Sequence, residues 1–400
     1  MLFRSMQPHV RILLHALGTA ALLLTAALGY AQSYACQALS CSSLVPGGSP
    51  EDRSTSDCGY ANGNSWWADY IAAPLLWRQA ATRPVTVALF DDGAAVDHED
   101  LRDVLWTNDR ELHGAPGVDD DRDGYVDDIH GWDFVDGTGD VAPHGGCVGR
   151  PSHGTFMASL IAAGRNGIGM VGAGSGSVRV MVLRVTGCGG EASRMDPERM
   201  RRALLYAVDK GAKVLSFSAH WTQTTPELDS TFAEIADSVS SPHAAVIVAS
   251  VPNKGEPQAG FPAAYTFRRI VRAVPIGDGN RISPGTSPAP AGLNLAAPSA
   301  CVLGATTAPS GYGLANGSSN STAILSGLLA GIWSRPPYAT LGPERFIERV
   351  VRSRMMATPR HTAPGSRAPY LEGIPIADAC LLVSRGHGAE VCSTGHGTAD

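Results

Sequence analysis

The sequence has no dense cluster of basic residues and no CxxC pair of cysteines. Its 31 lysines and arginines are outnumbered by 37 aspartates and glutamates, which gives a formal net charge of −6. This charge and the missing basic patch argue against nucleic acid as the main partner. Without a CxxC pair, a zinc site built from cysteines is not expected.

The bulk composition is that of a globular protein. Hydrophobic residues make up 44% of the chain and charged residues 17%, which is enough to build a large core. The 46 glycines and 27 prolines are spread along the chain, a pattern typical of many tight loops and not of low complexity. A chain of 400 residues could form two or three average domains, but α/β enzymes often place ~250–300 residues in one.

The N-terminus has the pattern of a secretory signal. Two arginines precede the apolar run Ala16–Leu28, and a small-residue cleavage site ends at Ala31. We therefore expect residues 1–31 to be a signal peptide and the protein to be exported, either periplasmic or secreted. The stretch from Val10 to Ala31 is also nearly long enough to span a bilayer. A retained anchor is the alternative, and membrane contact is expected only in that case.

The eight cysteines fit an exported protein. An even number in an oxidising compartment predicts disulfide bonds, although the sequence does not select one pairing. Cys380 and Cys392 flank a short loop and are the best candidates for a local bridge. Residues 32–64 form a polar, cysteine-containing arm that we expect to be irregular. The cysteines are at positions 36, 41, 58, 147, 188, 301, 380 and 392.

Residues 65–384 read as one α/β domain, followed by a tail over 385–400. Short, nearly continuous apolar runs predict strands buried on both faces, as in a parallel sheet. Apolar residues at helical spacing predict helices between them. The predicted fold has three layers, a mostly parallel central sheet flanked by helices. The strands are expected at 85–90, 178–185, 213–218, 245–250, 270–276 and 293–297, and helices at 66–77, 196–210 and 343–356.

The stretch Tyr312–Trp333 offers candidate nucleophiles. A Gly-, Asn- and Ser-rich loop leads into a run of small and aliphatic residues, so a hydroxyl is placed at the first turn of a buried helix. Unpaired backbone N–H groups and the helix dipole favour developing negative charge there. The same position suits an ordinary Ser N-cap. Ser318, Ser319 and Ser321 compete for either role.

An acidic loop is a candidate cation site. Asp119, Asp121 and Asp123 alternate ahead of a glycine, and Asp127 follows. This spacing resembles the first half of a calcium loop. The position of the closing glutamate of an EF-hand is His130, so a complete EF-hand is not supported. A solvated acidic loop is the alternative to a structural Ca²⁺.

Several segments, taken in order, resemble those of the subtilases, the subtilisin-like serine peptidases. An Asp follows a strand, a His begins a helix, an Asn follows a strand and a Ser begins a helix, in the Asp, His, Ser order of subtilisin. The resemblance extends from about Trp66 to Val383 and implies a subtilisin-like fold. The matching segments are VALFDDGAAVDHEDL, SHGTFMASLIAA, NGIGMVGAG, VIVASVPNKG, FPAAY and NGSSNSTAILSG.

Carried over position by position, the resemblance implies a catalytic triad of Asp91, His153 and Ser319. His153 would take the proton of the Ser319 hydroxyl, which is a poor nucleophile until a neighbouring base acts. Asp91 would hold the tautomer of His153 and stabilise the imidazolium. Asn253 would join the Ser319 backbone N–H in stabilising the oxyanion. Asp92 stands where the family has Ser or Thr, so it is a neighbour of the acid.

The resemblance also implies a substrate-binding edge. Ser218-Ala219-His220 stands where the family has Ser-Leu-Gly, a strand edge that pairs with extended substrate. Ser218 and Ala219 would line the cleft together with His220. The side chains of His220 and Trp221 are expected to crowd or reshape it.

The chain also departs from the family pattern. Asn320, Ser321 and Ala323 replace Met, Ala and Pro in the nucleophile segment, so a polar residue enters an apolar wall. Pro252 replaces the glycine before the oxyanion Asn, which restricts that turn. The arm over 32–64 is too short to be the folded propeptide of the family.

The leading function is therefore an exported serine endopeptidase that hydrolyses peptide bonds through an acyl-enzyme. It would act on polypeptides as a monomer and would need no cofactor for the chemistry. Two alternatives stay open. One is a weakly active or inactive subtilase-fold protein that binds partners or serves as a scaffold. The other is a specialised processing peptidase.

Overall fold

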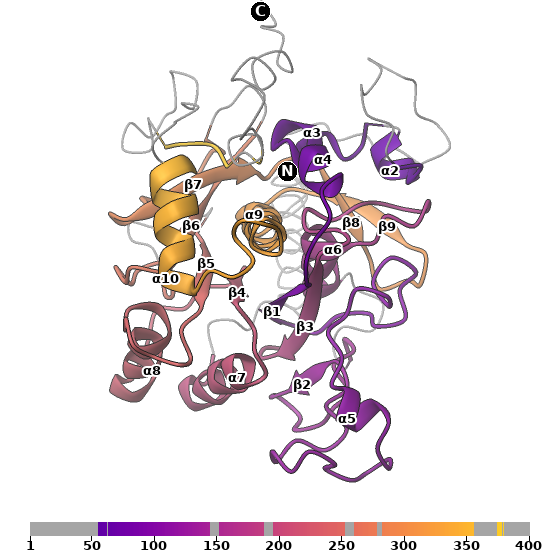
Figure 1. Ribbon diagram of the computed structural model, residues 1–400, viewed down its shortest axis with the longest axis vertical. Coiled ribbons are helices and arrows are strands. Elements are labelled where there is room, and N and C mark those ends of the chain that lie inside the picture. The colour runs from indigo at the N-terminus through magenta and orange to yellow at the C-terminus, as the bar shows by residue number, and fades with distance from the viewer. Residues whose placement is uncertain are drawn as a thin grey trace, which may run out of the picture. The chain divides into compact units, whose positions relative to one another are not determined.

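Seven strands of the described residues form one parallel sheet in this computed structural model (Figure 1). Their order is β2-β3-β1-β4-β5-β6-β7, and each neighbouring pair is parallel. The structure describes residues 55–61, 63–144, 152–187, 195–252, 260–277, 282–355, 374–377 and 379. The strands are β1 (Val85–Asp91), β2 (Gly131–Asp133), β3 (Val178–Arg184), β4 (Val214–Phe217), β5 (Val246–Ser250), β6 (Ile270–Ile276) and β7 (Leu293–Pro298).

Helices cover both faces of this sheet. Strand β1 shows the two faces because its side chains alternate with the period of a strand. Val87 and Leu89 lie in the core shared with α6 and α9, whereas Ala88 and Phe90 lie in the core shared with α7 and α8. The three-layer α/β prediction is confirmed. The four helices are α6 (His153–Ala162), α7 (Pro197–Asp209), α8 (Pro226–Ala236) and α9 (Ser318–Trp333).

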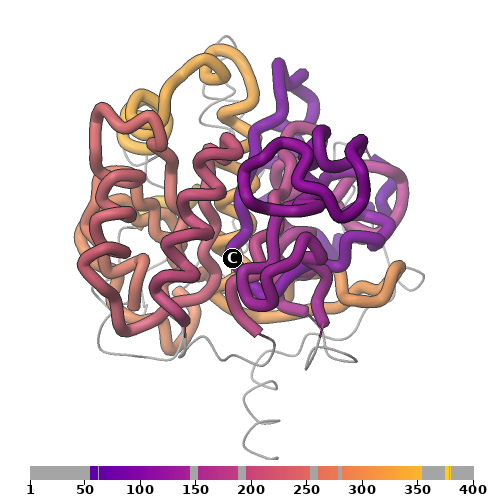
Figure 2. Tube along the Cα trace, turned by 90° about the horizontal axis from the view of Figure 1, so that it is seen from below, coloured from indigo at the N-terminus to yellow at the C-terminus, as the bar shows by residue number. Residues whose placement is uncertain are grey.

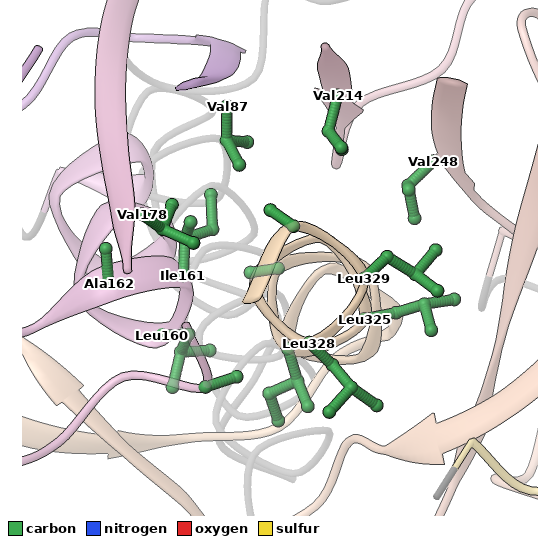
Figure 3. Packing of buried hydrophobic residues seen from close by; sticks show 14 of the residues in the cluster. Val87, Leu160, Ile161, Ala162, Val178, Val214, Val248, Leu325, Leu328 and Leu329 are labelled. Carbon is green, nitrogen blue, oxygen red and sulfur yellow. The ribbon is translucent and has the colours of Figure 1, made fainter. Parts of the chain in front are cut away.

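Helix α9 passes through the middle of the first core. Every residue of it except Ser319 is buried, which explains its run of small and aliphatic side chains. In Figure 3, Leu325 and Leu329 lie on the side of α9 toward Val248 of the sheet, whereas Leu328 points away from it. A Cβ on Gly327 would lie 2.4 Å from the carbonyl oxygen of Ile161. Glycine at this position therefore allows α9 to pack closely on α6.

Most predicted elements agree with the structure to within a residue or two. The helix expected at 66–77 is instead two short helices, because Ala72 adopts a left-handed conformation with φ of 54°. The late helix begins as α10 and continues as a π-helix, η4. The bounds are α2 (Cys58–Ala61), α3 (Trp66–Tyr70), α4 (Ala73–Trp77), α5 (Asp109–Leu112), α10 (Pro343–Phe346) and η4 (Ile347–Met355).

Some elements were not predicted. They are β2, the helices α2, α5 and α8, and a hairpin of β8 (Val302–Ala305) with β9 (Tyr312–Ala315). The start of the Tyr312–Trp333 stretch is therefore a strand, and the prediction of a loop there is wrong. Its four residues include a glycine and are only partly buried, so their sequence carries little strand signal, and the pairing with β8 determines the structure.

The predicted signal peptide (1–31), most of the arm and the tail (385–400) lie outside the described residues. Within the part of the chain that is described, no helix combines the length and the hydropathy needed to cross a bilayer.

Candidate active site

The end of β1 and the start of α6 bring an acid and a histidine together. Nδ1 of His153 lies 2.8 Å from Oδ1 and 2.9 Å from Oδ2 of Asp91. The Asp91 side chain is 4% exposed, whereas that of His153 is 44% exposed. A buried carboxylate thus holds one nitrogen of a ring that remains accessible to solvent.

Local sequence explains why these two elements meet. Ser152 caps α6, since its Oγ accepts the backbone N–H of Thr155 at 3.1 Å. A Cβ on Gly154 would lie 2.1 Å from the carbonyl oxygen of Gly93. Only glycine at position 154 therefore lets α6 approach the end of β1 closely.

The neighbouring carboxylate of Asp92 holds the start of α6. It accepts the Ser152 hydroxyl at 2.8 Å, the Gly154 N–H at 2.8 Å and the His153 N–H at 3.2 Å. Burial and the charge of Asp91 raise the pKa of Asp92 above its usual range. The two adjacent aspartates thus make different contacts.

The carboxylates also alter the basicity of the ring. Burial alone would lower the pKa of His153, but the charges of Asp91 and Asp92 and the hydrogen bond to Asp91 outweigh it. The pKa of His153 is raised from 6.5 to about 9. The imidazole is therefore protonated over much of the neutral range in the free protein.

The structure separates the three candidate serines of α9. Ser318 is buried and accepts the hydroxyl of Ser250 at 2.9 Å. Ser321 is fully buried and donates to the backbone carbonyls that end β7. Ser319 is only partly buried, and its hydroxyl donates to the carbonyl oxygen of Ser218 at 3.1 Å. Of the three, Ser319 is the one that solvent can reach.

The unusual polar residues after Ser319 have backbone partners. The Asn320 amide donates to the carbonyls of Ser299 at 3.0 Å and Ala315 at 3.1 Å. Ala323 is buried in the first core. The polar side chains at these positions thus have hydrogen-bond partners inside the protein, so they are compatible with a well-packed nucleophile segment.

The predicted substrate edge follows β4. Ser218 lies beside Ser319, and each hydroxyl donates to the carbonyl of the other residue. Ala219 and His220 follow and are partly exposed. The expectation that Trp221 crowds the cleft is wrong, because its ring is 5% exposed and packs with Phe217 in the second core. Asn253, the predicted oxyanion donor, lies outside the described residues.

The acidic loop gathers three of its four predicted ligands. Oxygens of Asp119, Asp121 and Asp123 lie within 4.8 Å of one another. Asp127 is not in this group, and its Oδ2 accepts the Gly117 N–H at 2.8 Å. The segment is drawn in purple in Figure 2, and Lys210, the residue that follows α7, contacts it.

Lys210 was missed by the sequence reasoning. Its Nζ lies 2.7 Å from Asp121, 2.6 Å from Asp123 and 3.1 Å from Asp128. Burial alone would raise the pKa of Asp121, but Lys210 and Asn108 outweigh it and lower the pKa to about 2. The loop therefore has a cation of its own, which lies 89 residues away in sequence and gives no local signal.

A second charged cluster lies where β2 and β3 end. The buried Arg184 donates to Asp133 and Asp136, and its Nη1 lies 3.1 Å from Nε2 of His144. The two aspartates and His144 have a spacing that could hold a metal ion. Arg184 contacts all three, so this cluster already contains a cation of its own.

The fold and this site define an α/β protein with an acid–histidine pair and an accessible serine beyond the carboxyl ends of parallel strands, where such sheets bind ligands. The model of the subtilase family matches residues 82–373. The chain therefore belongs to the subtilase family.

Individual relatives agree with this assignment. Subtilisin-like protease 1 of Plasmodium vivax is 42% identical over 87 residues, 22% of this chain and 13% of that protein. An intracellular serine protease of Paenibacillus polymyxa is 25% identical over 268 residues, 66% of this chain and 70% of that protein. The structure of the prenylagaramide maturation protease PagA has a TM-score of 0.57 at 16% identity, covering 78% of this chain and 96% of that one. The chain thus spans only a small part of the Plasmodium relative, and the last likeness concerns the fold alone.

Proposed function

We propose that this protein is a serine endopeptidase whose triad is Asp91, His153 and Ser319. The observation that supports the proposal concerns two neighbouring parallel strands. Asp91, which holds His153, ends β1, and Ser218, which lies beside Ser319, directly follows β4. Nδ1 of the ring is 2.8 Å from Asp91, which leaves Nε2 for a substrate-side proton. Family membership supports the same reaction class.

In the proposed reaction, neutral His153 removes the proton from the Ser319 hydroxyl as Oγ attacks the substrate carbonyl carbon. The tetrahedral intermediate collapses, the C–N bond breaks, and His153 returns the proton to the leaving amine. Water then attacks the acyl-enzyme in the same way and releases the new carboxylate. Asp91 keeps Nδ1 protonated and stabilises the imidazolium throughout.

The proposed reaction requires that the Ser319 hydroxyl rotate and that the oxyanion be bound. This hydroxyl now donates to Ser218, so it must rotate toward His153 before attack. Hydroxyl rotation is easy, and catalytic hydrogen bonds often form only with substrate bound. The developing oxyanion would be bound by the Ser319 backbone N–H and by Asn253. Loss of such a side-chain donor costs on the order of 10²–10³ in kcat.

We also propose export to an oxidising compartment, as the N-terminal pattern predicts. Cys58 and Cys301 each take part in a disulfide bond, which supports this proposal because stable disulfides are typical of exported proteins. A polypeptide would then be cut outside the cytoplasm. Detection of the protein only in the cytoplasmic fraction, with residues 1–31 retained, would refute this part of the proposal.

A structural cation at the acidic loop is a separate proposal. Asp119, Asp121 and Asp123 supply the oxygens that Ca²⁺ prefers. Oδ1 of Asp121 is buried and has no hydrogen-bond partner in the described structure, which leaves one ligand atom for an ion. Lys210 already provides positive charge there, so an ion would add to it. An unchanged melting temperature after EGTA treatment would argue against the ion.

Hydrolysis of casein and of a panel of internally quenched peptides tests the function. We expect cleavage by the wild type and loss of it in Ser319→Ala. Ser318→Ala is the matched control, because this neighbouring hydroxyl is buried and is expected to be dispensable for chemistry. No cleavage by correctly folded wild type would favour the binding or scaffold alternative. Cleavage of very few sequences would favour specialised processing.

A further inference from the structure

Asp92 is a buried carboxylate beside the proposed triad to which the mechanism above gives no role. Its side chain accepts hydrogen bonds from three donors at the start of α6. The Ser152 hydroxyl and the Gly154 N–H donate to Oδ1, each at 2.8 Å, and the His153 N–H donates to Oδ2 at 3.2 Å. These contacts join the end of β1 to the first turn of α6.

This arrangement holds the histidine from two directions. Asp91 binds the imidazole, and Asp92 binds the backbone from which the imidazole extends. The N–H groups at a helix start have no partner within the helix, and a carboxylate there is favoured by the helix dipole. The Ser or Thr of the family pattern would bring a hydroxyl but no charge. This chain therefore has a negative charge where the family pattern has none, and that charge can raise the pKa of the His153 ring.

Among the described residues, two charged groups act on His153. They are Asp91 and Asp92, both at the end of β1. The first turn of α6, which carries the ring, has no acidic residue, and neither has the first turn of α9. Removal of one carboxylate should therefore change the pKa of the His153 ring by a measurable amount.

We propose that Asp92 is a positioning residue that fixes His153 against Asp91 and, by its negative charge, shifts the working range of the base to alkaline pH. The proposal rests on the proposed function for its kinetic consequence but not for its electrostatic one. A carboxylate within ~4–6 Å stabilises an imidazolium and moves its pKa by about 1–3 units. More alkali is then needed to obtain the neutral base.

The electrostatic part is tested without catalysis. In a Ser319→Ala background, NMR titration of labelled histidine follows the ring of His153 in three proteins: Asp92 intact, Asp92→Asn and Asp97→Asn. Asp97 is the matched control, since it is exposed in the same loop. We expect Asp92→Asn to lower the ring pKa by on the order of one unit and Asp97→Asn to leave it unchanged. Equal shifts in both variants, or none in Asp92→Asn, would overturn the proposal.

The kinetic part uses the Ser319 enzyme. In Asp92→Asn, which keeps one acceptor oxygen, the acid limb of kcat/KM should move to lower pH while kcat on the alkaline plateau is largely kept. In Asp92→Ala, which keeps none, the plateau itself should fall by on the order of 10²-fold, as misplaced catalytic groups do. A plateau equal to wild type in Asp92→Ala would refute the positioning role.

Two safeguards keep the outcomes distinct. An inactive wild type would refute the proposed function, but the NMR titration would still decide the role of Asp92. If Asp92→Asn does not fold, Asp92→Ser, which carries the hydroxyl of the family pattern, replaces it in the same titration. A ring pKa equal to that with Asp92 intact would then overturn the proposal, and a lower one would support it.

Discussion

Replacement of Lys210 by methionine is expected to destabilise the acidic loop without affecting the proposed catalytic residues. The Lys210 ammonium group lies within 3.1 Å of three carboxylates, those of Asp121, Asp123 and Asp128. Asp128 is fully buried, whereas 12% of Asp121 and 29% of Asp123 are exposed. Methionine keeps most of the side-chain volume and removes the charge. The loop would then hold mutually repelling carboxylates without their counter-ion.

The magnitude follows from this partial burial. Removal of one partner from a buried ion pair costs about 3–5 kcal/mol, and the exposure of Asp123 places this case near the lower end, at about 3 kcal/mol. A change of that size lowers the melting temperature by roughly 6–12 °C in a domain of this order. The pKa of Asp121, lowered to about 2 mainly through Lys210 against the effect of burial, adds a pH signature. Its stabilisation is present above the unfolded pKa of about 3.9 and is lost as pH falls through about 2.

Calorimetry of the wild type and Lys210→Met, each with Ca²⁺ and with EGTA, measures this. Arg201→Met is the control, because the pair of Arg201 with Glu198 on the same helix is largely exposed and should contribute at most about 1 kcal/mol. A melting temperature of Lys210→Met equal to that of the control would refute the reasoning.

Three further predictions concern the site and the arm. Because the pKa of His153 is raised to about 9, the protonated ring stabilises the fold fully below about pH 6.5, and this contribution is lost as pH rises through about 9. Activity should rise over the same pH interval. Denaturation and kinetics measured against pH should therefore show opposite trends. Gly154→Ala would bring a Cβ to 2.1 Å from a backbone oxygen, so near-complete loss of activity is expected in peptide assays, and wild-type rates would contradict it. Asp57→Ala would remove the buried carboxylate that accepts the N–H groups of Asn166 and Gly167. Because water can reach these two residues, we expect a loss of only about 0.5–1.5 kcal/mol in urea unfolding, whereas no change would mean that the arm is dispensable.

The sequence predicted the central sheet well because its strands are buried on both faces. Continuous apolar runs such as Ile270–Ile276 identify such strands directly. Strand β9 could not be found in this way, since its four residues are only partly buried and depend on pairing with β8. Helix α9 was recognised because a helix buried all round must be apolar all round.

The candidate site was predicted in part. Family motifs named Asp91, His153 and Ser319, and the structure adds the burial that separates Ser319 from its neighbouring serines. The contacts of Asp92 and Lys210 could not be predicted from the sequence, because they join segments that meet only in the folded chain. The position of Trp221 was predicted wrongly because local sequence does not tell which side of a strand end faces the core.

Covalent labelling of Ser319 tests the central claim most directly. A fluorophosphonate probe reacts with a serine only when a neighbouring base activates it, and tandem mass spectrometry identifies the labelled residue. The account predicts one label on Ser319, faster at alkaline pH, and none in Ser319→Ala or His153→Ala. Folded, processed wild-type protein that takes no label, or takes it on another serine, would contradict it.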